Sequence, residues 1–196
     1  PKHAYQPRQS HNQVNILYVG RLQARKKVDD LLRVCGQYWR KGERIALIIV
    51  GDGPEKENLQ ELAQKVFPSA KFTGALHGKD VQPYFEQADL FVLPGTGGLA
   101  VQEALSYGLP VIVAEADGTQ SNMVRQENGW VIDPSNPDGL LDALGQAIRM
   151  RQNLSLMGKV SFEIASKEVN INQMVMVFEQ AVLYAQEKVE QCESWS

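Results

Sequence analysis

The amino-acid sequence has few of the residues that would tie a protein to a metal, a disulfide framework or a membrane. Its 196 residues include only two cysteines, Cys35 and Cys192, without metal-ligand spacing, so one disulfide at most is possible. A reducing, cytoplasmic setting fits this cysteine content best. No apolar run approaches the roughly 20 residues that a membrane-spanning helix needs. We therefore predict a cytoplasmic protein without a bound metal.

The charge balance and the missing motifs disfavour further classes of ligand. A net charge of -3 and an isoelectric point near 5.7 argue against nucleic acid as the main partner. Lys and Arg do cluster at residues 21–27 and 40–44, but such clusters are more often solvated faces than sites. The chain has no Walker A loop and no dinucleotide fingerprint after its first predicted strand, which disfavours a nicotinamide enzyme. We predict no cofactor.

What the sequence does contain is a regular alternation of short β-branched runs with amphipathic helical patterns. This alternation predicts an α/β fold with a doubly wound, mostly parallel, Rossmann-like sheet. We expect a linker or cut end over residues 1–13, one domain over 14–190 and a polar tail over 191–196. Strands are predicted at 15–19, 45–50, 71–73, 90–93, 110–114 and 130–132. Helices are predicted at 29–40, 55–66, 80–87, 99–107, 119–125, from Ser135-Asn136-Pro137 onward, at 154–166 and at 171–190.

In a parallel sheet, ligands bind beyond the carboxyl ends of the strands, so the loops after these strands should form any site. The glycine-rich run at residues 94–98 opens directly into the helix predicted from Leu99. Free amide groups and the helix dipole at such a start favour an anion. Arg21 and Lys26, which follow the first strand, would add full positive charge to the same phosphates.

Each of these signals also has a structural interpretation. The glycine-rich run could equally be a tight strand-to-helix connection, and residues 51–54 are more typical of a turn before a helix. His77 is more typical of a loop residue than of a base. Glu103, about one turn into the helix, could be an acid that is favourable near the helix start, or it could accept hydrogen bonds from a ribose.

A resemblance emerges when the motifs are read together. The segments that carry it are Gly20-Arg21-Leu22 with Lys26, Val50-Gly51-Asp52-Gly53-Pro54, Ala88-Asp89-Leu90-Phe91-Val92-Leu93-Pro94, Gly98-Leu99-Ala100-Val101-Gln102-Glu103-Ala104, Gly108-Leu109-Pro110-Val111 and Asn128-Gly129-Trp130. In this order, over roughly residues 14–148, they resemble the group 1 family of GT-B glycosyltransferases. The resemblance implies the C-terminal half of a GT-B fold, which binds a nucleoside diphosphate sugar.

The resemblance also implies roles for individual residues. Arg21 and Lys26 would hold the donor diphosphate and neutralise the departing nucleoside diphosphate, and Glu103 would hold the ribose. The amides of Leu99 and Ala100 would cap a phosphate. The predicted site as a whole comprises Gly20, Arg21, Lys26, Gly51, Gly74, Ala75, Leu76, His77, Thr96, Gly97, Gly98, Leu99, Ala100 and Glu103.

The sequence departs from the family pattern at two positions. The first glutamate of the family's Glu-x7-Glu motif would fall at Gly95, so the contact to the donor sugar is lost or moves to neighbours such as Thr96 or to the bare amides of Gly97 and Gly98. Lys27 stands where the family usually has glycine; its side chain could add a phosphate contact, but we expect it to point to solvent.

The resulting hypothesis is metal-independent transfer of a hexose from a nucleoside diphosphate sugar, with UDP the commonest carrier, to an acceptor hydroxyl with retention. The expected partners are the N-terminal Rossmann-like half, a glycan or lipid-linked acceptor and, for the intact protein, the inner face of a membrane. Surface polysaccharide or lipopolysaccharide synthesis is the expected pathway. Three alternatives stay open, namely an epimerase half, a phosphorylase half and a non-catalytic nucleotide-binding module.

Overall fold

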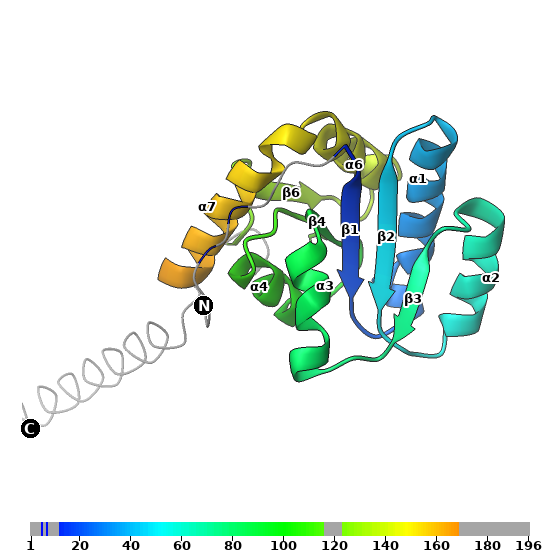
Figure 1. Cartoon of the computed structure of the whole chain (residues 1–196). Helices are drawn as coiled ribbons and strands as arrows, with labels where there is room; N and C mark the ends of the chain where they lie inside the picture. Colours follow the sequence, from blue (N-terminus) through cyan, green and yellow to red (C-terminus); the bar gives the residue numbers. More distant parts are fainter. Residues whose placement is uncertain (1–4, 6, 8–11, 116–122, 169–196) are drawn as a thin grey trace, which may run out of the picture.

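The computed structural model describes Tyr5, Pro7 and residues 12–115 and 123–168. Within this part of the chain, six strands form one sheet in the order β3-β2-β1-β4-β5-β6, and every neighbouring pair is parallel (Figure 1). This strand order is that of a doubly wound Rossmann-like sheet, so the predicted fold class is confirmed.

The elements lie close to their predicted positions. The strands are β1 (Val14–Val19), β2 (Ile45–Val50), β3 (Lys71–Gly74), β4 (Leu90–Leu93), β5 (Val111–Ala114) and β6 (Gly129–Ile132). The helices are α1 (Val28–Arg40), α2 (Lys56–Val66), α3 (Gln82–Gln87), α4 (Leu99–Ser106), α6 (Gly139–Arg149) and α7 (Leu154–Lys167), with 3-10 turns η1 (Ala24–Lys26), η2 (Gly78–Asp80) and η3 (Arg151–Asn153). The strand boundaries differ by at most one residue from those predicted.

Burial on both faces of the sheet explains why the central strands are continuous apolar runs in the sequence. All residues of β4 and β5 are buried, as expected for strands covered on both faces. Helix α1 packs against α2 and α6, whereas α4 packs against α7, so helices cover both sides of the sheet. Alternating strands and helices therefore place every strand-to-helix loop along one edge of the sheet.

Helix α4 is held in position at its C-terminal end. Gly108 adopts a left-handed conformation with φ of 65°, and its amide donates to the carbonyl of Leu105 at 2.9 Å. A Cβ atom added to Gly158 on α7 would lie 2.1 Å from the carbonyl oxygen of Gly108. The backbones of α4 and α7 therefore touch without intervening side chains, and this contact fixes the helix whose other end faces the loops of the predicted site.

Three details differ from the predictions. The helix predicted to start at residues 135–137 begins at Gly139, because Asp133 accepts hydrogen bonds from both the amide and the hydroxyl of Ser135 and holds that residue in a turn. The helix predicted over 80–87 is divided into η2 and α3. Trp39, an apolar residue of the helix predicted over 29–40, is 44% exposed rather than buried, in the last turn of α1.

Two predicted helices cannot be compared. The one at 171–190 lies outside the described residues, as does most of the one at 119–125. Among the helices that the structure does describe, none combines the length and the hydropathy required to cross a bilayer.

Candidate functional site

The strand order reverses between β1 and β4, the point at which doubly wound sheets bind ligands, and we call the edge of the sheet at the carboxyl ends of the strands around this point, including the cavity described next, the crevice. Strand β1 pairs with β2 on one side and with β4 on the other, so the chain winds outward in opposite directions from this point. The helices that follow these two strands, α1 and α4, therefore lie on opposite faces of the sheet, whereas the two loops themselves touch where Gly95 meets Arg25. These are the two loops that contain Arg21 and the glycine-rich run at 94–98.

A cavity of about 580 Å³ lies at the ends of β1 and β2 and beside the loop after β3. Six predicted site residues line it, namely Gly20, Arg21, Gly51, Ala75, Leu76 and His77. The remaining lining residues are Val19, Val50, Asp52 and Gly53. The cavity thus combines apolar walls with a cation, a carboxylate and an imidazole at its rim, a composition typical of small-molecule sites.

The floor of this cavity is made of backbone segments in direct contact. The amide of Gly20 donates to Val50, and the amide of Gly51 donates to Gly74 at 2.8 Å. A Cβ atom at Gly51 would lie 1.9 Å from the carbonyl oxygen of Gly20, so no side chain fits between these two loops. Gly74 contributes through this hydrogen bond and does not itself line the cavity.

Two polar residues beside the cavity were not part of the predicted site. The Tyr18 hydroxyl donates to the carbonyl of Arg21 at 3.2 Å from a fully buried position, which fixes the backbone of Arg21. Burial raises the pKa of Tyr18. The Asp52 carboxylate accepts a hydrogen bond from the Lys56 ammonium at 2.6 Å, and this hydrogen bond lowers the pKa of Asp52. Tyr18 lies inside a strand pattern and Asp52 inside a turn motif, so neither carried a separate sequence signal.

Lys26 belongs to the other side of the crevice. Its ammonium donates to the carbonyl of Thr96, and a Cβ atom at Gly97 would lie 2.6 Å from that ammonium nitrogen. The neighbouring Arg25 guanidinium lies 3.4 Å from the Thr96 hydroxyl. The turn η1 therefore holds the glycine-rich loop through two cations, and Lys26, Thr96 and Gly97 lie together.

The charge of Lys26 should be sensitive to pH. Partial burial lowers the pKa of the Lys26 ammonium from its ordinary value of 10.5, and the nearby charge of Arg25 lowers it further. If Lys26 binds phosphate, affinity for pyrophosphate should fall as the pH rises through this lowered pKa, because the free ammonium loses its proton. Calorimetric titration at a series of alkaline pH values should show this step, and Lys26→Arg should remove it since a guanidinium stays charged. The same step in both proteins would show that another group titrates.

The start of α4 faces the same loop. Gly98 is the N-cap of α4, and its carbonyl accepts hydrogen bonds from the amides of Val101 and Gln102. Within the described part of the chain, the amides of Leu99 and Ala100 have no protein acceptor, as expected for the first turn of a helix. The side chain of Leu99 is 84% exposed. These two amides are thus available to an anion, and the phosphate contact expected of them stays a prediction.

Glu103 lies one turn further along α4. Burial raises the pKa of Tyr107, and the carboxylates of Glu103 and of Glu86 on α3 raise it further, so Glu103 lies on the side of α4 that is close to α3. The ring of Tyr107 stacks on Phe85 of α3 with centroids 5.0 Å apart. Glu103 does not line the 580 Å³ cavity, and its contact with a ribose stays a prediction.

Gly95 is enclosed by backbone. A Cβ atom at this position would lie 2.2 Å from the carbonyl oxygen of Arg25 and 2.6 Å from the Cα atom of Lys26. The loop after β4 therefore rests directly on η1, and the position leaves no room for the acid that the family motif would place there. Glycine at 95 is a packing requirement of this loop.

Lys27 takes the left-handed conformation with φ of 52°, and its side chain is exposed. Glycine adopts this left-handed conformation without strain, which accounts for the glycine that the family usually has at this position. The solvent-facing orientation expected for the Lys27 side chain is confirmed.

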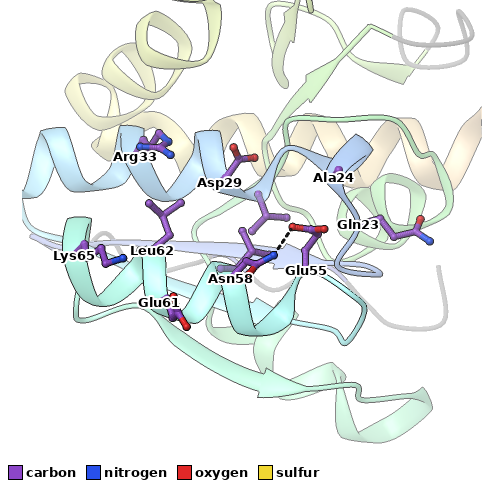
Figure 2. Close-up of a pocket in the computed structure, with 11 residues that line it drawn as sticks. Gln23, Ala24, Asp29, Arg33, Glu55, Asn58, Glu61, Leu62 and Lys65 are labelled. Carbon is purple, nitrogen blue, oxygen red and sulfur yellow. Dashed lines mark hydrogen bonds between the residues drawn. The ribbon is translucent and has the colours of Figure 1, made fainter.

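Other cavities lie elsewhere. Figure 2 shows one of about 410 Å³ between α1 and α2, lined by charged side chains that include Asp29, Arg33 and Lys65, with Asn58 donating to Glu55 at 3.3 Å. Helices rather than strand ends form its walls. Among the described residues there is no group of three side chains that could hold a metal ion. The crevice at β1 and β4 is therefore the better candidate.

Comparisons with known proteins bear on this crevice. The family profile described as "Glycosyl transferases group 1" matches residues 2–161. The sulfoquinovosyl transferase SQD2 of Arabidopsis thaliana is 32% identical over 158 residues, covering 78% of this chain and 30% of that protein. A GDP-mannose-dependent alpha-mannosyltransferase of Corynebacterium glutamicum is 40% identical over 119 residues, covering 59% of this chain and 27% of the relative.

Solved structures agree in fold. The structure of Anabaena HepE in complex with UDP superposes with a TM-score of 0.71 at 23% identity, covering 87% of this chain and 49% of that one. The chain spans less than a third of the length of the two curated relatives and about half of this structure. The similarity thus concerns a part of each of these proteins.

Proposed function

This chain belongs to the group 1 glycosyltransferase family, and we propose that it is the donor-binding, C-terminal-type half of a retaining glycosyltransferase. The proposed reaction moves a hexose from a nucleoside diphosphate sugar to an acceptor hydroxyl. The observation that carries the proposal is that one edge of the sheet presents two features, a cavity with apolar walls lined by Arg21 at β1 and β2, and the contact of Lys26 with the loop that leads into the free amides of α4.

The crevice offers each part of a nucleotide sugar a matching environment. The walls formed by Val19, Val50 and Leu76 suit a base, since apolar surfaces bury planar rings favourably. Arg21 and Lys26 suit the diphosphate, together with the amides at the start of α4. Glu103 is the proposed ribose ligand.

In the proposed reaction the bond between the anomeric carbon and the diphosphate oxygen breaks, and its electron pair leaves with the diphosphate. The acceptor oxygen forms the new bond on the same face of the sugar, and its proton passes to the departing diphosphate oxygen. Arg21 and Lys26 stabilise the charge that develops on the leaving group, which is the type of interaction that lowers such barriers most. This role needs no metal ion.

UDP is the proposed carrier. Anabaena HepE was solved in complex with UDP, whereas the corynebacterial relative is named for GDP-mannose, so the base needs a direct test. We further propose an acceptor in surface polysaccharide or lipopolysaccharide synthesis, and the other half of the enzyme as the source of the acceptor site.

The experiment is a calorimetric titration of the chain with uridine, guanosine and adenosine diphosphates, repeated with Glu103→Ala. We expect one nucleotide to bind selectively and the substitution to weaken it by about tenfold, because a charge-assisted pair of ribose hydrogen bonds is lost. Gln102→Ala, an exposed neighbour on α4, is the matched control and should bind normally. Binding of none of the three would argue against a donor domain.

The absence of an acid at position 95 favours a second candidate function, that of a non-catalytic nucleotide-binding module. The enclosed backbone at this position excludes the acid that would contact the donor sugar. Nucleotide binding without any sugar transfer or donor hydrolysis by the intact protein would support this candidate over the enzyme.

A further inference from the structure

A second group of cations lies at the edge of the sheet opposite the crevice. This group, the basic edge, consists of seven exposed side chains: Arg40, Lys41, Arg44, Lys65, Lys71, Arg149 and Arg151. They come from the C-terminal ends of α1, α2 and α6 and from the residues around the starts of β2 and β3, along the edge drawn at the top of Figure 1. Segments 37–44, 64–71 and 149–153 contain one carboxylate, that of Glu43, which is half-buried. The edge is thus strongly positive in a chain whose net charge is -3.

Side-chain contacts connect the C-terminal end of α1 to the end of α2 and to the first turn of α6. The ring centroids of Trp39 on α1 and Phe67 after α2 are 6.0 Å apart. The Tyr38 hydroxyl donates to the carbonyl of Leu141 on α6 at 3.0 Å, and the Lys41 ammonium lies 5.3 Å from the Tyr38 ring centroid. The cations therefore sit on one rigid surface formed by packed elements.

Helix dipoles account for only part of this charge. A cation in the last turn of a helix is favourable, which explains Arg40, Lys65 and Arg149. Arg44 and Lys71 lie outside helices and have no such explanation. Among the described residues, none of the seven cations forms an ion pair. The carboxylates of Asp142 and Glu43 lie close enough to Tyr38 to raise its pKa beyond the effect of burial, so the seven cations outnumber the carboxylates at this edge without being paired by them.

Two large apolar side chains lie among these cations. Trp39 is 44% exposed and Met150 is 39% exposed, although most apolar side chains of this size are buried in the core. A tryptophan beside lysine and arginine is the combination found where proteins meet the headgroup region of a bilayer. We propose that the basic edge is a docking surface for an anionic lipid bilayer.

The charge alone would also suit a nucleic acid, but the aromatic content favours lipid. Surfaces that bind single strands line a groove with several aromatic rings on which successive bases stack. The basic edge has one exposed aromatic ring, Trp39, and that ring already contacts Phe67. One interfacial anchor surrounded by cations matches a lipid surface, where each cation near the headgroups adds attraction.

The test is co-sedimentation of the full chain with vesicles of phosphatidylglycerol and phosphatidylcholine in equal parts, against vesicles of phosphatidylcholine alone. We expect binding to the anionic vesicles only, and release by added salt because these charges are exposed. Lys41→Gln/Arg44→Gln should weaken binding at least tenfold. Lys79→Gln/Lys159→Gln removes two exposed cations from other faces and should change binding less than twofold.

Uridine diphosphate binding, measured in the same variants, separates this proposal from the donor site, which lies at the other edge and should be unaffected. Trp39→Ala should retain salt-sensitive binding at lower affinity, and its far-UV circular dichroism reports whether it folds. Equal loss in both double variants would show nonspecific attraction and overturn the proposal. Binding to polyuridylate without binding to anionic vesicles would overturn it in favour of nucleic acid.

Discussion

Arg21→Ala should lower the turnover of the intact protein by roughly 100-fold to 1,000-fold, the range found when a single group that stabilises developing negative charge is removed. Arg21 lines the 580 Å³ cavity at the end of β1, and its backbone is fixed by the Tyr18 hydroxyl. The guanidinium would pair with the diphosphate more strongly as the sugar departs, so kcat should fall more than KM rises.

The measurement is initial-rate kinetics with the nucleotide sugar that the titration selects. Arg33→Ala removes an equally exposed guanidinium from α1 and should leave kcat within twofold. Arg21→Lys should recover only part of the rate, because an ammonium cannot donate two parallel hydrogen bonds. Unchanged turnover in Arg21→Ala would contradict the role assigned to this residue.

Gly95→Glu should destabilise the domain by about 3 kcal/mol or more rather than supply the acid of the family motif. The new Cβ atom would lie 2.2 Å from the carbonyl oxygen of Arg25 and 2.6 Å from the carbonyl carbon of Lys26, and backbone cannot move aside as a flexible side chain can. The loop would have to leave η1, which would also separate Lys26 from Thr96.

Thermal or urea unfolding of the Gly95 variant measures this cost. Gly139→Ala is the matched control, because a Cβ atom there has its nearest neighbour at 3.6 Å, an ordinary contact. Thr96→Glu places a carboxylate on the exposed next residue and should fold normally. A fully stable Gly95→Glu protein would show that the loop can adopt another conformation that accommodates the side chain. Packing would then not explain why this chain lacks the acid.

Much of the fold could be predicted because burial leaves a direct trace in the sequence. The apolar runs of β2 and β4 lie at the predicted residues, since a strand covered on both faces needs apolar side chains at nearly every position. The position of the site followed from the same reasoning, because parallel topology places all strand-to-helix loops at one edge. Local competition was harder to predict: Asp133 holds Ser135 in a turn and delays α6 by a few residues.

The roles of individual glycines could not be predicted from the sequence. Gly95 and Gly97 lie in one run, yet Gly95 accommodates the backbone of Arg25 and Gly97 accommodates the ammonium of Lys26. Tyr18 was indistinguishable from any other strand residue, although its hydroxyl fixes Arg21. Such roles depend on segments distant in sequence, and a local pattern contains no trace of them.

The central position of β1 has a consequence for how this chain folds during synthesis. On one side β1 pairs with β2, which follows it closely, whereas on the other side it pairs with β4, and the amide of Asn15 donates to Asp89, 74 residues later. As the chain leaves the ribosome, β1 can join β2 and β3 early, but its second edge stays unpaired until β4 has emerged. An unpaired apolar edge can recruit a neighbouring nascent chain. The time that translation takes from β3 to β4 is therefore the period in which the second edge of β1 is open to such contacts.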